Sequence, residues 1–152
     1  MITPNPLSLI AAMTDTVPRI VLDTNVLYAG LYSASGKSYQ LLKVIEAGRV
    51  RIALSTPLLF EYEDVLKRNQ ATLDLSETEV DVVLDNLCTL ADFQAVYFLW
   101  RPCLPDAKDD MVLELAVAAQ VPRIVSFNAK DFRLAFRFGI EVVSPKIILE
   151  DL

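Results

Sequence analysis

The fold expected for this chain is decided by the stretch Arg19-Ile20-Val21-Leu22-Asp23-Thr24-Asn25. Its run of three apolar residues, two of them β-branched, predicts a short strand that is covered on both faces. Asp23 follows at the point where that strand would leave the sheet. Ligands of open parallel sheets bind outside the carboxyl ends of the strands, so this carboxylate is placed to hold a cation or a substrate. Asp is also a favoured N-cap residue, and a cap on a helix starting near Val26 is the alternative.

The rest of the chain alternates between helical and extended patterns. Further strands are expected at residues 51–54, 123–126 and 141–143, and a strand or an extended segment at residues 95–100. Helices are expected at residues 25–32, 38–47, 55–66, 76–87 and 111–119, with shorter helical segments before residue 138 and after residue 144. This alternation predicts an α/β fold with a mostly parallel central sheet flanked by helices.

The length of 152 residues suits one domain with a full core and is too short for two ordinary domains. Residues 1–17 have no clear hydrophobic period, so we expect a flexible N-terminal tail there and a single domain over residues 18–152. The sequence has no signal-peptide pattern and no apolar run long enough to span a membrane. We therefore expect a cytoplasmic protein without membrane association.

Composition excludes several kinds of site. The sequence has no histidine, which rules out Ser-His-Asp and Cys-His catalysis and any histidine-ligated zinc within this chain. Its two cysteines, Cys88 and Cys103, have neither metal-ligand nor disulfide-framework spacing. The net charge of −6 repels nucleic acid at long range, so nucleic-acid binding would need cations held at the carboxylates.

Several acidic and amide side chains are expected to meet at one edge of the sheet. They are Asp23, Glu61 or Glu63, Asp109, Asp110, Asn128 and Asp131. A cluster of unpaired carboxylates is unfavourable unless cations occupy it. Oxygen ligands without histidine or cysteine favour Mg²⁺ or Mn²⁺, and two such ions about 4 Å apart promote in-line attack on a phosphodiester. The acids therefore predict a metal-dependent phosphodiesterase site.

Each of these residues also has an ordinary structural interpretation. Glu61 and Glu63 flank the apolar stripe that contains Tyr62, each about 100° from its centre, so periodicity does not choose between them. Asp109 and Asp110 can stabilise a helix dipole, and Asp110 shares its face with Glu114. The turn after residue 126 favours Asn and Asp residues for conformational reasons.

Three basic residues lie next to or shortly after the last of these acids, Asp131. They are Lys130, Arg133 and Arg137. A solvated helix face explains them, although Lys130 and Arg133 are close enough to the same edge to meet a phosphate backbone.

Four motifs in this order resemble the PIN domain. They are residues 22–27 (Leu-Asp-Thr-Asn-Val-Leu), residues 55–66 around Glu61, Asp109-Asp110 before an alanine-rich helix, and residues 126–132 (Ser-Phe-Asn-Ala-Lys-Asp-Phe). The resemblance covers residues 19–149 and is strongest to the PIN-type toxins of toxin–antitoxin pairs, the VapC-like ribonucleases. It implies a PIN-like three-layer fold and an endoribonuclease that uses Mg²⁺ or Mn²⁺ to activate water.

The resemblance also implies roles for individual residues. Asp23 matches the first acid of the family, Glu61 rather than Glu63 the second, and Asp110 the third, with Asp109 beside it. Asn128 occupies the fourth position, where many members carry Asp. This departure leaves two alternatives for the metal site: Asp131 compensates for the missing acid, or one ion suffices.

The family further implies supporting residues and partners. Thr24, Asn25 and Ser126 are expected to orient ligands or water, the protein to form a homodimer, and a small antitoxin protein to inhibit it. A catalytically weak PIN-like binding module is one alternative, suggested by Asn128. A metal-dependent phosphatase with Asp23 as nucleophile is another, but such enzymes commonly carry an acid at the position of Asn25.

Overall fold

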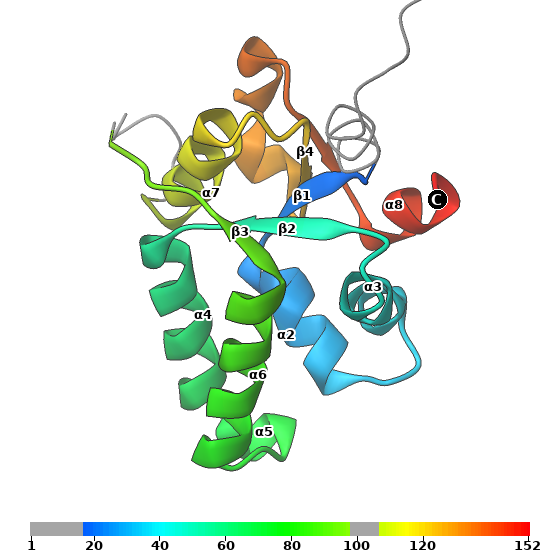
Figure 1. Cartoon of the computed structure of the whole chain (residues 1–152), viewed down its shortest axis with the longest axis vertical. Helices are drawn as coiled ribbons and strands as arrows, with labels where there is room; N and C mark the ends of the chain where they lie inside the picture. The colour runs from blue at the N-terminus through cyan, green and yellow to red at the C-terminus, as the bar shows by residue number, and fades with distance from the viewer. Residues whose placement is uncertain (1–16, 98–106) are drawn as a thin grey trace, which may run out of the picture.

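The structure is a computed structural model that describes residues 17–97 and 107–152, and it contains an all-parallel five-stranded sheet (Figure 1). The strand order is β3-β2-β1-β4-β5. The strands are β1 (Arg19–Leu22), β2 (Arg51–Leu54), β3 (Ala91–Phe93), β4 (Arg123–Val125) and β5 (Glu141–Val143). The expected parallel α/β fold is confirmed. The tail expected at residues 1–17 lies, except for Val17, outside the described residues.

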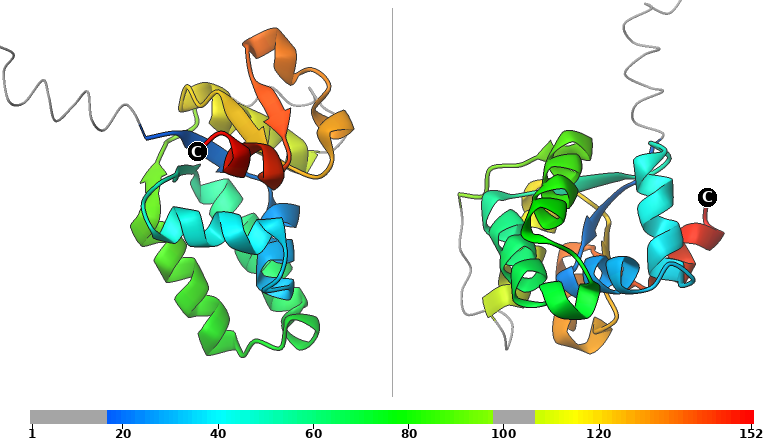
Figure 2. Two further views of the ribbon diagram at one scale, coloured as in Figure 1. Left: turned by 90° about the vertical axis from the view of Figure 1, so that its right-hand side faces the viewer. Right: turned by 90° about the horizontal axis from the view of Figure 1, so that it is seen from below.

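Helices cover both faces of this sheet. They are α2 (Thr24–Tyr32), α3 (Lys37–Glu46), α4 (Thr56–Arg68), α5 (Gln70–Leu73), α6 (Glu77–Leu90), α7 (Ala107–Ala118) and α8 (Pro145–Glu150), with 3₁₀ helices η1 (Ala129–Phe132) and η2 (Ala135–Phe138). Helices α2 to α6 lie on one side of the strands and α7 on the other, which gives three layers (Figures 1 and 2).

The handedness of parallel connections explains this division. Crossovers between parallel strands are right-handed, so the face that a connecting helix covers depends on the direction in which the chain moves across the sheet. The chain moves one way from β1 through β2 to β3, and α2 to α6 cover one face. It then returns past β1 to β4, so α7 covers the opposite face and packs against β1, β2 and β4.

Local sequence signals define the helix ends. The Ser55 hydroxyl accepts a hydrogen bond from the backbone N–H of Leu58 at 3.3 Å, and Pro57 occupies the first turn of α4. Ser76 and Glu79 form the expected capping box of α6. These caps satisfy backbone donors at the two helix starts.

Of the two alternatives expected for residues 95–100, a strand or an extended segment, the strand is wrong within the described residues. Strand β3 lies earlier, at Ala91–Phe93, directly after α6, and residues 95–97 have no regular structure; residues 98–100 are outside the described chain. Asp92 at the centre of β3 interrupts the apolar pattern from which a strand is predicted. In the fold this carboxylate is an ion-pair partner of Arg51 on the neighbouring strand β2 and of Arg19 on β1.

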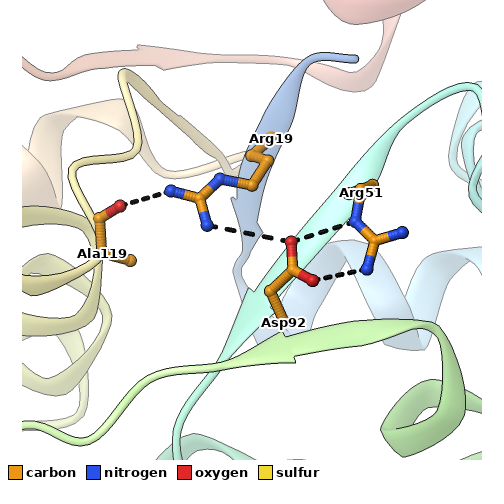
Figure 3. Close-up of polar contacts among 4 residues, drawn as sticks. All are labelled: Arg19, Arg51, Asp92 and Ala119. Carbon is orange, nitrogen blue, oxygen red and sulfur yellow. Dashed lines mark hydrogen bonds and ion pairs between the residues drawn. The ribbon is translucent and has the colours of Figure 1, made fainter. Parts of the chain in front are cut away.

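Figure 3 shows this polar cluster, which joins β1, β2 and β3 to Ala119, the residue that follows α7. Arg51 makes two hydrogen bonds to Asp92, one of them 3.0 Å from Nε to Oδ2. Arg19 lies 3.8 Å from the same carboxylate and donates a 2.6 Å hydrogen bond to the carbonyl of Ala119. The hydrogen bonds and charge of Arg51 lower the pKa of Asp92. Because Arg19 and Arg51 begin β1 and β2, the cluster ties the strands together near their amino ends.

The core lies between these layers. Ile20, Val21 and Leu22 of β1 are fully buried, as expected for a strand covered on both faces. None of the helices in the described ranges is long and apolar enough to cross a membrane.

Candidate functional site

The candidate site lies where the strand order reverses, between β1 and β4. The chain leaves β1 toward β2 on one side, whereas β4 pairs with β1 on the other, and the carboxyl end of such a pair of strands is where open sheets bind ligands. Asp23 follows β1 and Ser126 follows β4. The Ser126 hydroxyl donates a 2.7 Å hydrogen bond to Oδ2 of Asp23, so this bond crosses the reversal point.

Asp23 is held by two hydrogen bonds. Its other oxygen, Oδ1, accepts from the backbone N–H of Thr24 at 2.8 Å, and Asp23 is the N-cap residue of α2. The Ser126 oxygen accepts in turn from the backbone N–H of Asn128 at 3.0 Å. Asp23 therefore caps the helix, and the same bonds hold its carboxylate in one orientation at the edge of the sheet.

The pKa of Asp23 depends on its burial, on two hydrogen bonds and on two nearby acids. Burial raises the pKa of Asp23, the hydrogen bonds from Ser126 and Thr24 oppose this rise, and the charges of Asp131 and Glu61 add to it. Asp131 lies on η1 and Glu61 on α4. Three acids from three separate segments thus interact at the carboxyl edge of the sheet.

Glu61 and Glu63 lie in different surroundings. The Glu61 side chain is 14% exposed and pairs with Lys108, whose Nζ lies 3.5 Å from Oε1. The Glu63 side chain is 43% exposed and pairs with Lys67 of its own helix at 3.4 Å. Of the two acids that periodicity left undecided, Glu61 is the one that affects Asp23.

Tyr62 connects α4 to the end of β1. Its side chain is fully buried, and its hydroxyl donates a hydrogen bond to the backbone carbonyl of Leu22, the residue before Asp23. Burial raises the pKa of Tyr62 and keeps the hydroxyl protonated as a donor. The sequence pattern predicted Tyr62 only as part of an apolar stripe. A buried tyrosine hydroxyl needs a hydrogen-bond partner, and this requirement was the signal for a polar contact of Tyr62.

The first turn of α7 lies near Glu61. Lys108 precedes Asp109 and Asp110 in this turn, and its ion pair with Glu61 links α7 to α4. Asp110 is 1% exposed, and Glu114, one turn later, is also buried. Sequence analysis noted Glu114 only as a like-charged neighbour of Asp110; its i, i+4 spacing on an otherwise apolar helix was the available signal.

The turn after β4 carries the remaining predicted residues. Asn128 is exposed, and its contact with Ser126 is made through its backbone N–H. Lys130 and Arg133 are exposed on the same segment. On α2, Oδ1 of Asn25 is buried and has no hydrogen-bond partner among the described residues.

Over residues 19–130 the sequence matches the family model of the PIN domain, which covers most of the chain. The chain belongs to the PIN-domain family. PIN domains have a three-layer α/β fold and are generally metal-dependent nucleases. The match begins at β1 and ends in η1, so it includes Asp23, Glu61, Asp110 and Asn128. A search of curated proteins finds none that matches the chain.

PIN domains commonly bind divalent metal ions, and the donors of this site fit such an ion in kind. Asp23, Glu61 and Asp131 supply carboxylate oxygens. Asn25, two residues after Asp23, has a buried side-chain oxygen that receives no hydrogen bond from the described residues. In the described part of the chain, however, no three acidic or cysteine side chains are close enough to hold one ion together. Mg²⁺ often binds through one or two carboxylates and keeps several waters, so the donor set fits a hydrated ion.

Proposed function

We propose that the chain is a metal-dependent endoribonuclease that hydrolyses RNA phosphodiester bonds and acts as the toxin of a toxin–antitoxin pair. The observation that carries this proposal is the position of Asp23. It is a buried carboxylate at the reversal point of a PIN-domain sheet, oriented by Ser126 and Thr24 and close to two further acids. Such an arrangement is unfavourable by itself and becomes favourable with a bound cation.

In this proposal one or two of the carboxylates of Asp23, Glu61 and Asp110 bind a hydrated Mg²⁺ or Mn²⁺ directly, and the others contact its water ligands. Asp109, Asp131 and Asn128 lie at the margin of this site. The ion supplies Lewis-acid catalysis and lowers the pKa of bound water. The protein orients the ligands: Ser126 and Thr24 fix the Asp23 carboxylate, and Tyr62 fixes the strand end that carries it.

Residues after β4 support RNA as the substrate. Lys130 and Arg133 are exposed beside the site in a chain whose net charge is −6, so they provide local positive charge for a phosphate backbone. Phe127 lies between two residues of the Asp23 hydrogen-bond network and is 53% exposed. An exposed aromatic ring beside basic residues suits the stacking of an unpaired RNA base.

The toxin assignment adds two partners to the proposal, a second copy of the chain and a small antitoxin protein. A catalytically weak PIN-like binding module is the second candidate function, and the observation in its favour is Asn128 at the fourth family position. The two functions differ in outcome, since a binding module retains RNA without cleaving it.

Cleavage of RNA by the purified chain tests the proposal. Activity should appear with Mg²⁺ or Mn²⁺ and disappear with a chelator. Asp23→Asn and Glu61→Gln should each reduce activity by at least roughly 100-fold. Asn is as good an N-cap as Asp, so the first variant keeps the helix cap.

Glu63→Gln is the matched control, because it removes the same charge from the same helix outside the site. It should retain most of the activity. A folded Asp23→Asn protein with near-normal, chelator-sensitive cleavage would refute the proposed site, and RNA binding without cleavage would favour the binding module.

A further inference from the structure

One basic side chain points into the acidic site. Lys108 belongs to the first turn of α7, and its ammonium lies 3.5 Å from the Glu61 carboxylate. The Glu61 carboxylate is mostly buried, and it interacts with Asp23. Lys108 therefore supplies positive charge at the place where the proposed function needs a cation.

The position of Lys108 is unfavourable for its own helix. A positive charge in the first turn of a helix opposes the helix dipole, which favours Asp and Glu there. Lys43–Glu46 and Lys146–Glu150 are pairs within single helices, as helix spacing alone produces. The Lys108–Glu61 pair instead joins α7 to α4, so helix spacing does not account for it.

The negative charges around Glu61 favour its ion pair with Lys108. Burial is the main cause of the raised pKa of Asp23, and the negative charges of Asp131 and Glu61 repel its carboxylate and add to the rise. An ammonium beside Glu61 offsets part of this repulsion. A divalent cation at the same carboxylates would offset it more fully, and the two cations would repel each other.

We propose that Lys108 is an exchangeable counter-ion of the site, which pairs with Glu61 when no metal is bound and is displaced when a hard divalent cation binds. This inference rests on the proposed metal-dependent function. It states that Lys108 competes with the metal ion for the Glu61 carboxylate. Binding of the ion must break the Lys108–Glu61 pair and leaves the ammonium of Lys108 near the bound ion.

The effect of removing this competitor follows from Coulomb's law. A double and a single positive charge about 5 Å apart in water-like surroundings change an affinity by roughly 15-fold, and salt at physiological strength reduces this to roughly four-fold. Lys108→Gln should therefore tighten binding of Mn²⁺ by roughly four- to fifteen-fold, and the gain should shrink as ionic strength rises.

Calorimetric titration of the full chain with Mn²⁺ alone, in the absence of RNA, tests this inference. Lys43→Gln is the matched control, because Lys43 is 56% exposed and 3.6 Å from its acidic partner, compared with 54% and 3.5 Å for Lys108. The Lys43→Gln substitution changes the net charge by the same amount as Lys108→Gln, but on α3. We expect its Mn²⁺ affinity to stay within about two-fold of the unsubstituted chain. Lys108→Arg, which keeps the charge, should also resemble the unsubstituted chain.

The outcomes separate the inference from the proposed function. If the unsubstituted chain does not bind Mn²⁺, both the metal-dependent function and the counter-ion role are refuted. If it binds Mn²⁺ and Lys108→Gln matches Lys43→Gln, or binds more weakly than the unsubstituted chain, the counter-ion role alone is refuted. Tighter binding by Lys108→Gln only, lost at high salt, supports the inference.

Discussion

Replacement of Tyr62 by Phe tests the connection between α4 and the end of β1. The substitution removes one hydroxyl and leaves the buried ring, so the apolar packing of the core is retained. It deletes the hydrogen bond to the carbonyl of Leu22. Leu22 is itself fully buried, so its carbonyl loses this partner in surroundings that water does not reach readily.

The size of the effect follows from this geometry. A buried acceptor left without a partner costs about 1–3 kcal/mol of unfolding free energy. For a domain of this length each kcal/mol corresponds to roughly 2–4 °C, so Tyr62→Phe should lower the Tm by roughly 2–12 °C. Burial of the Tyr62 ring contributes to neither figure, because phenylalanine fills the same space.

Thermal and urea unfolding of the metal-free chain measure this loss. Tyr32→Phe is the control, since Tyr32 is 61% exposed and stacks on Tyr28 through its ring, which the substitution keeps. Its stability should change by less than about 0.5 kcal/mol. Equal stability of Tyr62→Phe and the unsubstituted chain would show that the hydroxyl does not hold α4 to β1.

Three further predictions concern charge and packing. Asp92→Asn should cost roughly 1 kcal/mol at pH 7, a modest amount because the ion pairs that lower the pKa of Asp92 are partly exposed. This difference in urea unfolding should begin to shrink as the pH falls below about 4, where Asp92 of the unfolded chain becomes protonated, and should vanish only below the lowered pKa of the folded state. Asp23→Asn should raise the stability of the metal-free chain at pH 7, since burial raises the pKa of Asp23, and the gain should diminish toward pH 4 in the same assay. Gly30→Ala should lower the Tm, because its Cβ would lie 2.5 Å from Leu42 and 3.1 Å from the Ser38 carbonyl, an overpacking cost of about 1–3 kcal/mol against at most about 1 kcal/mol of improved helix propensity.

The fold was predictable where local signals coincide with tertiary structure. Strand β1 is a continuous apolar run followed by an acid, and α6 begins with a capping box, so both were expected from sequence. Strand β3 was not, because α6 runs into it without Gly or Pro and Asp92 interrupts its apolar character. Its polar centre is tolerated only through Arg19 and Arg51, which come from two other strands.

In the candidate site, too, some features could be predicted from the sequence and others could not. Parallel topology alone brings the ends of β1 and β4 together, so proximity of Asp23 to the segment containing Asp131 could be expected. The choice between Glu61 and Glu63 depends on how α4 packs, which periodicity does not resolve. The Tyr62 bond and the Lys108–Glu61 pair are tertiary contacts with no local pattern, and sequence analysis found neither.

Strands β1 and β2 pair only near their amino ends, so the angle between them affects the positions of the acids at the carboxyl edge of the sheet. Within the described residues these strands pair only at Arg19–Arg51 and Ile20–Ile52, and the Arg51–Asp92 contact reinforces the same end. Strand β1 pairs with β4 up to Leu22, so these two strands would turn together relative to β2. Ile20 and Asp23 lie about 10 Å apart at roughly 3.3 Å per residue, so a rotation of about 6° moves Asp23 by about 1 Å. Metal sites tolerate errors of only about 0.2 Å in ligand distance. Substitutions at Arg51 should therefore alter the cation affinity proposed for the carboxyl edge of the sheet, because they would change the angle between β1 and β2.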